Sequence, residues 1–247
     1  MTYREFRPRA QLSDLVACTW QRRVQAPRAD GATRVLPDGC VDLIWRDGEL
    51  FVAGPDRGPF MSPVPAGGAI VGLRLLPGAA GGVLGIPASE LRDLRLPLVD
   101  VWGRSAAVLA ERLALARSPH ERRSVLEDAL TARRGRMPSA DPLVRAAVDR
   151  LGLPGSRVRA LSRALGASER NLLRRFHAQV GYGPKTLDRV LRFQRFLARA
   201  PALGRGDDQL ARVALELGYT DQAHLTRECV RLSGLTPTHL LSPRPAG

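Results

Sequence analysis

Residues 158–176, VRALSRALGASERNLLRRF, decide how the C-terminal part of the chain folds. The first half of this stretch, residues 158–165, carries leucines at the spacing of one helical face. Gly166 can end that helix in a left-handed cap, and Ser168 is a suitable N-cap for the helix that follows. The stretch therefore predicts two short helices joined by a tight turn.

The second of these helices separates apolar from basic residues. Leu172, Leu173 and Phe176 recur at i, i+1 and i+4, and we expect them to point inward. The residues expected to remain mostly outward are Arg170, Asn171, Arg174 and Arg175. A short helix followed by a basic helix is the layout of a helix-turn-helix unit, whose second helix lies in the major groove of DNA.

The same plan occurs again further along the chain. A long helix is predicted from Pro184 to about Leu197, and residues 209–217 form a short helix. Asp221 can then cap a helix over residues 222–233. The sequence thus predicts two helix-turn-helix units joined by one helix.

Motifs of a known family are spread over both units. They are Leu161, Ala164, Leu165-Gly166, Ser168-Glu169-Arg170-Asn171-Leu172, Arg175-Phe176, Val180-Gly181-Tyr182-Gly183-Pro184-Lys185, Leu191-Arg192, Leu210-Ala211, Ala214, Leu217-Gly218-Tyr219-Thr220-Asp221-Gln222-Ala223-His224-Leu225-Thr226-Arg227 and Gly234-Leu235-Thr236-Pro237. With these residues, the stretch from about Asp141 to Leu241 resembles the DNA-binding domain of the AraC/XylS family of bacterial transcription regulators. The resemblance implies a sequence-specific DNA-binding regulator, with RNA polymerase as a further partner if it is an activator.

The resemblance and the outward-facing positions together suggest which residues contact DNA. The residues expected to read bases are Arg170, Asn171, Arg174, Gln222, His224, Thr226 and Arg227. Arginine suits guanine O6 and N7, and asparagine or glutamine suits adenine N6 and N7. The residues expected at phosphates are Ser168, Arg175, Lys185, Arg192 and Arg231. For the four basic ones, the alternative is that they are only solvated.

The first hundred residues have the pattern of short strands. Residues 41–45 and 50–53 are apolar and flank Asp47-Gly48, which is a strong signal for a hairpin turn. Residues 69–76 predict another strand, whereas the proline- and glycine-rich residues 54–68 predict turns and loops. We therefore expect a small sandwich or barrel rather than a parallel sheet.

A weaker resemblance covers this N-terminal part. Its residues are Leu36-Pro37-Asp38-Gly39-Cys40-Val41-Asp42-Leu43-Ile44-Trp45, Gly72-Leu73-Arg74 and Pro77-Gly78-Ala79-Ala80. They resemble a cupin-like sensor or association domain, which implies an effector pocket or a dimer contact. The candidate pocket residues are Asp38, Cys40, Asp42, Trp45 and Arg74. The alternative is structural: a turn at Asp38, core positions for Cys40 and Trp45, and an internal pair of Arg74 with Asp42.

Helical spacing begins near Gly103. Residues 103–136 predict a helical hairpin and linker, with Pro119 in the first turn of the second helix. The expected fold class is α+β, with a β-rich cupin-like domain over residues 1–102 and an all-α double helix-turn-helix domain over residues 137–247. If a ligand controls DNA binding, we expect the hairpin or the linker at residues 137–141 to be the element that moves.

Composition agrees with a nucleic-acid partner. Lysine and arginine total 38 against 24 acidic residues, a net charge of +14, and residues 156–247 hold 16 basic and 7 acidic side chains. The three cysteines are too few for a disulfide framework, and the charged N-terminus and lack of a long apolar run favour the cytoplasm over a membrane. The four histidines lack metal-ligand spacing with the cysteines, so no metal or other cofactor is expected.

The preferred hypothesis is a bacterial transcription regulator, not an enzyme, controlled by a small organic effector or by homodimer formation. The first alternative is a cupin-like enzyme with a basic domain that localises it on nucleic acid. A cupin enzyme would need a histidine-rich metal centre, and residues 1–100 contain no histidine. The second alternative is a protein that only sequesters a small molecule.

Overall fold

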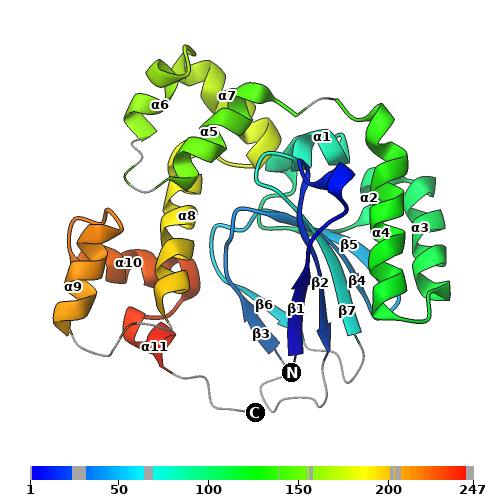
Figure 1. Ribbon diagram of the computed structural model, residues 1–247, viewed down its shortest axis with the longest axis horizontal. Helices are drawn as coiled ribbons and strands as arrows, with labels where there is room; N and C mark the ends of the chain where they lie inside the picture. Colours follow the sequence, from blue (N-terminus) through cyan, green and yellow to red (C-terminus); the bar gives the residue numbers. More distant parts are fainter. Residues whose placement is uncertain are drawn as a thin grey trace.

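The computed structural model describes residues 2–23, 32–63, 69–138, 140–153, 155, 158–200, 203 and 207–242. The N-terminal part builds antiparallel sheets and the C-terminal part is helical, which confirms the predicted fold class (Figure 1). Within these residues, no helix combines the length and apolarity needed to cross a membrane.

A six-stranded antiparallel sheet forms the centre of the N-terminal part. Its strands, in spatial order, are β1 (Thr2–Phe6), β2 (Val16–Arg23), β7 (Ala69–Leu75), β4 (Val41–Arg46), β5 (Glu49–Ala53) and β8 (Arg95–Pro97). The hairpin of β4 and β5 turns at Asp47 and Gly48, both with positive φ, as the sequence predicted. Side chains alternate between the two faces, so the strands present one apolar face and one mixed face.

A second sheet of two strands corrects one prediction. β3 (Ala32–Val35) pairs with β6 (Phe60–Pro63), which lies inside the stretch that the sequence predicted as turns and loops. Proline and glycine around β6 favoured the prediction of a loop. The strand forms because it pairs with β3, which lies about thirty residues earlier in the chain. Pro63 is tolerated because it stands at the end of an edge strand.

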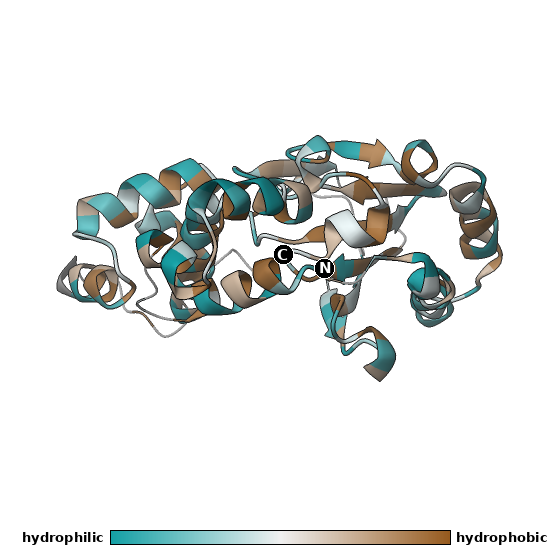
Figure 2. Cartoon of the chain, turned by 90° about the horizontal axis from the view of Figure 1, so that it is seen from above, coloured by the Kyte–Doolittle hydropathy of each residue, from teal (hydrophilic) through white to brown (hydrophobic). Residues whose placement is uncertain are grey.

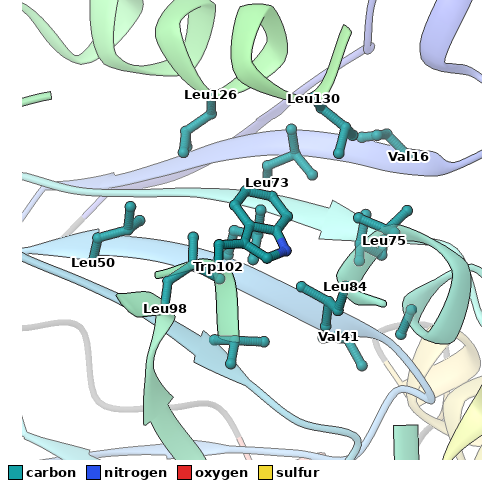
Figure 3. Packing of buried hydrophobic residues seen from close by; sticks show 14 of the residues in the cluster. Val16, Val41, Leu50, Leu73, Leu75, Leu84, Leu98, Trp102, Leu126 and Leu130 are labelled. Carbon is teal, nitrogen blue, oxygen red and sulfur yellow. The ribbon is translucent and has the colours of Figure 1, made fainter. Parts of the chain in front are cut away.

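Helices cover the apolar face of the large sheet. They are α1 (Ala80–Leu84), α2 (Leu98–Trp102), α3 (Arg104–Leu115) and α4 (Pro119–Arg133), with short 3₁₀ turns η1 (Ala10–Leu12), η2 (Ala88–Glu90) and η3 (Arg134–Arg136). Figure 3 shows Leu126 and Leu130 of α4 pointing toward β7, the strand that carries Leu73 and Leu75. Each such fully buried side chain contributes about 1.5–3 kcal/mol relative to an exposed one. The predicted helical hairpin is α3 and α4, and Pro119 stands in the first turn of α4.

The described residues of the C-terminal part form α-helices. They are α5 (Pro142–Gly152), α6 (Val158–Ala164), α7 (Glu169–Val180), α8 (Pro184–Arg199), α9 (Asp207–Glu216), α10 (Gln222–Ser233) and α11 (Pro237–Leu241). In Figure 2, hydrophobic and hydrophilic residues alternate along these helices, as expected for amphipathic helices around a core.

The long helix α8 belongs to two separate hydrophobic cores. Leu187, near its start, packs with α5, α6 and α7, whereas Val190, Phe193 and Phe196 pack with α9 and α10. These side chains recur every three residues, and each such step falls about 60° short of a full helical turn. Leu187 and Phe196 therefore lie on opposite sides of α8. One rigid helix therefore joins two three-helix units, each with a core of its own.

Candidate DNA-binding face and N-terminal pocket

Helices α7 and α10 begin and end in the same way. The Ser168 hydroxyl accepts a hydrogen bond from the Asn171 backbone N–H, and the Asp221 carboxylate accepts one from the His224 N–H. Both helices have 12 residues and end at a glycine in the left-handed conformation, Gly181 or Gly234. These caps give the two helices that the sequence predicted to lie in the major groove, α7 and α10, equivalent boundaries.

The outer side of α7 is a shallow hollow. Its lining residues are Ser168, Arg170, Asn171, Leu173, Arg174 and His177. The structure thus brings together the three residues predicted to read bases from this helix. It also corrects the prediction that Leu173 points inward: Leu172 and Phe176 are buried, but 47% of Leu173 is exposed. Sequence reasoning missed both Leu173 and His177.

Side-chain hydrogen bonds organise part of this face. Asn171 Oδ1 accepts bonds from Arg174 Nη2 at 3.1 Å and from Arg175 Nε at 3.2 Å. Arg175 also pairs with the carboxylate of Asp141, the N-cap of α5, at 2.8 Å. Arg175 therefore ties α7 to α5, whereas Arg170 and Arg174 stay exposed to solvent.

Helix α10 carries the second predicted set. Gln222, His224 and Thr226 are half-buried and Arg227 is exposed. His224 Nδ1 accepts the Thr220 N–H at 3.2 Å, and its ring meets the Tyr219 ring edge-on with centroids 5.4 Å apart. A neutral imidazole held in this way carries its proton on Nε2, where it can donate to an acceptor on a base edge.

The predicted phosphate residues divide into two kinds. Lys185 and Arg231 are exposed, and Ser168 lies at the N-terminus of α7. Arg192 instead pairs with Asp188 and donates to the Gly218 carbonyl at 3.1 Å, so its guanidinium is engaged inside the second unit. Burial raises the pKa of Asp188, and Arg192 opposes that shift.

A cavity of about 430 Å³ lies over the mixed face of the large sheet. Strand alternation places apolar side chains such as Trp20, Ile44 and Phe51 along the middle of its floor. Residues from β3, β6 and the loop after β3, among them Leu36 and Phe60, line it as well. The cavity is mainly apolar, as binding sites for small organic molecules usually are.

A partly buried ion-pair cluster lies at one end of the floor. Arg74 donates two hydrogen bonds of 3.1 Å to Asp42 and lies 3.3 Å from Asp38. The Trp20 indole N–H also donates to Asp42, at 3.0 Å, across Gly72, where a β-carbon would collide with the indole ring. Burial raises the pKa of Asp42, and Arg74 opposes that shift.

Four of the five predicted pocket residues line this cavity: Asp38, Cys40, Asp42 and Arg74. The internal pair of Arg74 with Asp42, which the sequence offered as the alternative interpretation, is also present. Trp45 is a correction: it alternates to the opposite face of β4 and is buried in the core under the helices. Burial also raises the pKa of the Cys40 thiol well above its usual range, so the thiol stays protonated at neutral pH.

Sequence reasoning missed the other charged end of the cavity. Arg95 pairs with Asp56 through bonds of 2.8 and 2.6 Å, and its guanidinium lies 3.9 Å from the centroid of the Phe60 ring. Arg95 and Asp56 flank a long connection and share no local motif. The period-two alternation of β2 and β5, by contrast, could have identified Trp20 and Phe51 as neighbours of Asp42.

The cavity wall touches the C-terminal helices directly. The Pro37 carbonyl accepts a hydrogen bond of 2.6 Å from Gln194 of α8. Gly39 packs so closely that a β-carbon there would lie 2.9 Å from Leu187 Cδ1. Arg34 of β3 donates to the Ser233 carbonyl, at the end of α10, at 2.9 Å. β3 and β6 thus lie between the sheet and the second helix-turn-helix unit (Figure 1).

The first unit has its own contact with the N-terminal part. A β-carbon on Gly181 would lie 2.9 Å from the Ala88 carbonyl oxygen of η2, and Arg92 donates to the Gly181 carbonyl at 3.4 Å. A β-carbon on Gly81 of α1 would collide with the Ala178 carbonyl. Both α7 and α10 are therefore held at their C-terminal ends, and their N-terminal turns are left outward.

Comparison with family models separates the chain into two matched regions. Residues 161–242 match a model described as a helix-turn-helix domain, over both units seen in the structure. These residues form an AraC-type helix-turn-helix domain. Residues 4–97 match a model described as a domain of unknown function, DUF6597. None of the curated proteins matches the chain.

The chain that carries this AraC-type domain is a DNA-binding transcription regulator. Among solved structures it is similar to ToxT from Vibrio cholerae, with 10% identity, a TM-score of 0.45, and coverage of 90% of this chain and 97% of that chain. A structure of wild-type ToxT with a bound unsaturated fatty acid gives 11% identity, a TM-score of 0.45, and coverage of 90% and 94%. At these values the likeness supports no transfer of residues or ligands to this chain.

Proposed function

We propose that this chain is a one-component regulator in which a small organic molecule in the N-terminal pocket changes how both helix-turn-helix units bind promoter DNA. One observation carries the proposal. Residues 35–38 and Cys40 line the cavity, and within the same loop Pro37 and Gly39 contact α8. A ligand that shifts this loop must shift its contact with the helix that joins the two units.

The DNA contacts follow from which side chains are available. Base reading is assigned to Arg170, Asn171, Arg174, Gln222, His224, Thr226 and Arg227, whose helices present them around the outward N-terminal turns. Phosphates are assigned to Lys185, Arg231 and the amide groups that follow Ser168 at the start of α7. Arg175 and Arg192 are assigned to holding the helices in place, because each pairs with a carboxylate inside the domain.

Because promoter DNA lies in the bacterial cytoplasm, we assign the protein to that compartment. We assign residues 1–102 to the ligand-binding domain, residues 103–136 to the hairpin and linker, and residues 137–247 to DNA binding. A homodimer and RNA polymerase are the further partners expected of such a regulator. Catalysis is not part of the proposal.

The test uses the full chain and a pocket-filling variant. A library of small organic molecules is screened by thermal shift, and the DNA affinity of the protein is measured with and without each hit. Ala53 is buried on the cavity floor, so Ala53→Leu occupies part of the space. We expect this variant to lose both the thermal shift and the ligand effect on DNA affinity, while it still binds DNA without ligand.

Ala107→Leu is the matched control, since Ala107 is exposed on α3, far from the cavity lining. It should respond to ligand as the wild type does. A hit that stabilises Ala53→Leu as strongly as the wild type binds elsewhere and contradicts the assigned pocket. Equal affinity of the wild-type protein for selected and scrambled duplexes contradicts regulation by specific DNA binding.

A further inference from the structure

Leu173 is a large apolar side chain on a surface that also carries two arginines. It is 47% exposed and lies in the hollow on α7 together with Arg170, Arg174 and His177. The core side of the helix is already filled by Leu172 and Phe176, which recur at i and i+4. Leu173, the next residue after Leu172, therefore lies on the outer face of the helix.

Leu173 is also held in place rather than free in solvent. Its Cδ1 packs against the backbone at the start of α8, where a β-carbon on Gly183 would lie only 2.8 Å away. A supported leucine costs little ordering entropy when it meets a partner. The surrounding cations select a polyanion as that partner, and α7 is a recognition helix of a DNA-binding domain.

Duplex DNA offers one apolar group in the major groove. Adenine, guanine and cytosine present hydrogen-bonding edges, whereas thymine also presents its 5-methyl group. We propose that Leu173 contacts the 5-methyl group of a thymine and makes that base pair part of the recognised sequence. This inference rests on the proposed placement of α7 in the major groove.

The second recognition helix has a comparable group at the equivalent position. Thr226 follows the Asp221 cap by the same five residues that separate Leu173 from Ser168. Its hydroxyl donates to the Gln222 carbonyl at 3.0 Å, so that proton is not available to a base. Thr226 can therefore offer DNA only its oxygen, as an acceptor, and its methyl group. Both units therefore carry a methyl-bearing side chain five residues after the cap.

The experiment removes the methyl group from the DNA and the side chain from the protein. A binding site is first selected with the full-length chain, and the half-site of α7 is identified as the one whose base preference changes in Arg174→Ala. Each thymine of that half-site is then replaced, one at a time, by deoxyuridine, which lacks the 5-methyl group. We expect one replacement to weaken wild-type binding about fourfold, the effect of removing one buried methyl group.

The same replacement should have no effect on Leu173→Ala, whose affinity for the thymine site is already reduced. Leu115→Ala is the control: Leu115 is 80% exposed, but it lies on α3, and this variant should keep the full deoxyuridine effect. The inference is overturned if no deoxyuridine in the half-site weakens wild-type binding, or if Leu173→Ala loses affinity on replacement as the wild type does. Failure to select any site overturns the proposed function itself, which is a different result.

Discussion

Arg174 and Lys185 are both exposed cations of the same domain, but they occupy different kinds of position. Arg174 lies on the outer face of α7 and is oriented by Asn171 Oδ1, whereas Lys185 lies in the first turn of α8. An oriented guanidinium can bind guanine O6 and N7 at once, and a single ammonium group on a flexible stem suits a phosphate. The two side chains should therefore contribute differently to DNA binding.

We predict that Arg174 determines base preference and that Lys185 determines the salt dependence of DNA binding. Arg174→Ala should cost about 1–3 kcal/mol and relax the preference at one or two base pairs. Lys185→Ala should weaken selected and unrelated duplexes alike and reduce the salt slope by about one. Both are measured by DNA titration at several salt concentrations. An Arg174→Ala variant with an unchanged base preference would remove this residue from readout.

At the scale of elements, the two recognition helices depend on their first residues. Each N-cap side chain accepts a backbone N–H that would otherwise lack a partner, serine in α7 and aspartate in α10. An anionic cap also interacts favourably with the positive end of the helix. The two helices thus use different N-cap residues, serine in α7 and aspartate in α10. Replacing the serine by alanine or by aspartate tests how much the cap contributes.

We predict that Ser168→Ala lowers the free energy of unfolding by about 0.5–2 kcal/mol, because the Asn171 N–H loses its acceptor. Ser168→Asp should restore stability, since Asp221 does the same in the second unit. Thermal and denaturant unfolding of both variants measure the difference. The DNA affinity of Ser168→Asp should nevertheless be lower than that of the wild type, because the added carboxylate at the start of α7 repels phosphate. A Ser168→Ala protein as stable as the wild type would show that the cap contributes nothing.

Sequence patterns predicted the elements whose signals are local. Caps, prolines and glycines located α4, α7 and α10, and the Asp47-Gly48 turn located one hairpin. β6 was missed because it forms a strand only by pairing with β3. Leu173 was wrongly predicted to point inward because two adjacent leucines both fit the spacing of a buried helix face. At the pocket, Asp38, Cys40, Asp42 and Arg74 were found, but Arg95 and Asp56 meet only through the fold.

At the scale of the whole molecule, the described residues of the N-terminal part contact the DNA-binding part at several places, three of which involve α7, α8 and α10. η2 and α1 contact the end of α7, the loop with Pro37 and Gly39 contacts α8, and Arg34 contacts the end of α10. The two recognition helices must reach successive major-groove segments about one helical turn apart. Contacts at both helix ends and at the joining helix can therefore set the geometry on which DNA affinity depends.

Arg34 is the most specific of these contacts, because it joins β3 to the last carbonyl of a recognition helix while the next residue, Val35, lines the cavity. A ligand changes DNA affinity only by the difference in its affinity for two arrangements, typically 5–150-fold in such coupling. We predict that Arg34→Ala keeps the thermal shift caused by ligand but loses most of the change in DNA affinity. Arg4→Ala, an exposed arginine of β1, is the control and should retain both. The measurement is DNA titration at zero and saturating ligand; an unchanged ratio of the two affinities in Arg34→Ala would mean that coupling runs through α8 or α7 instead.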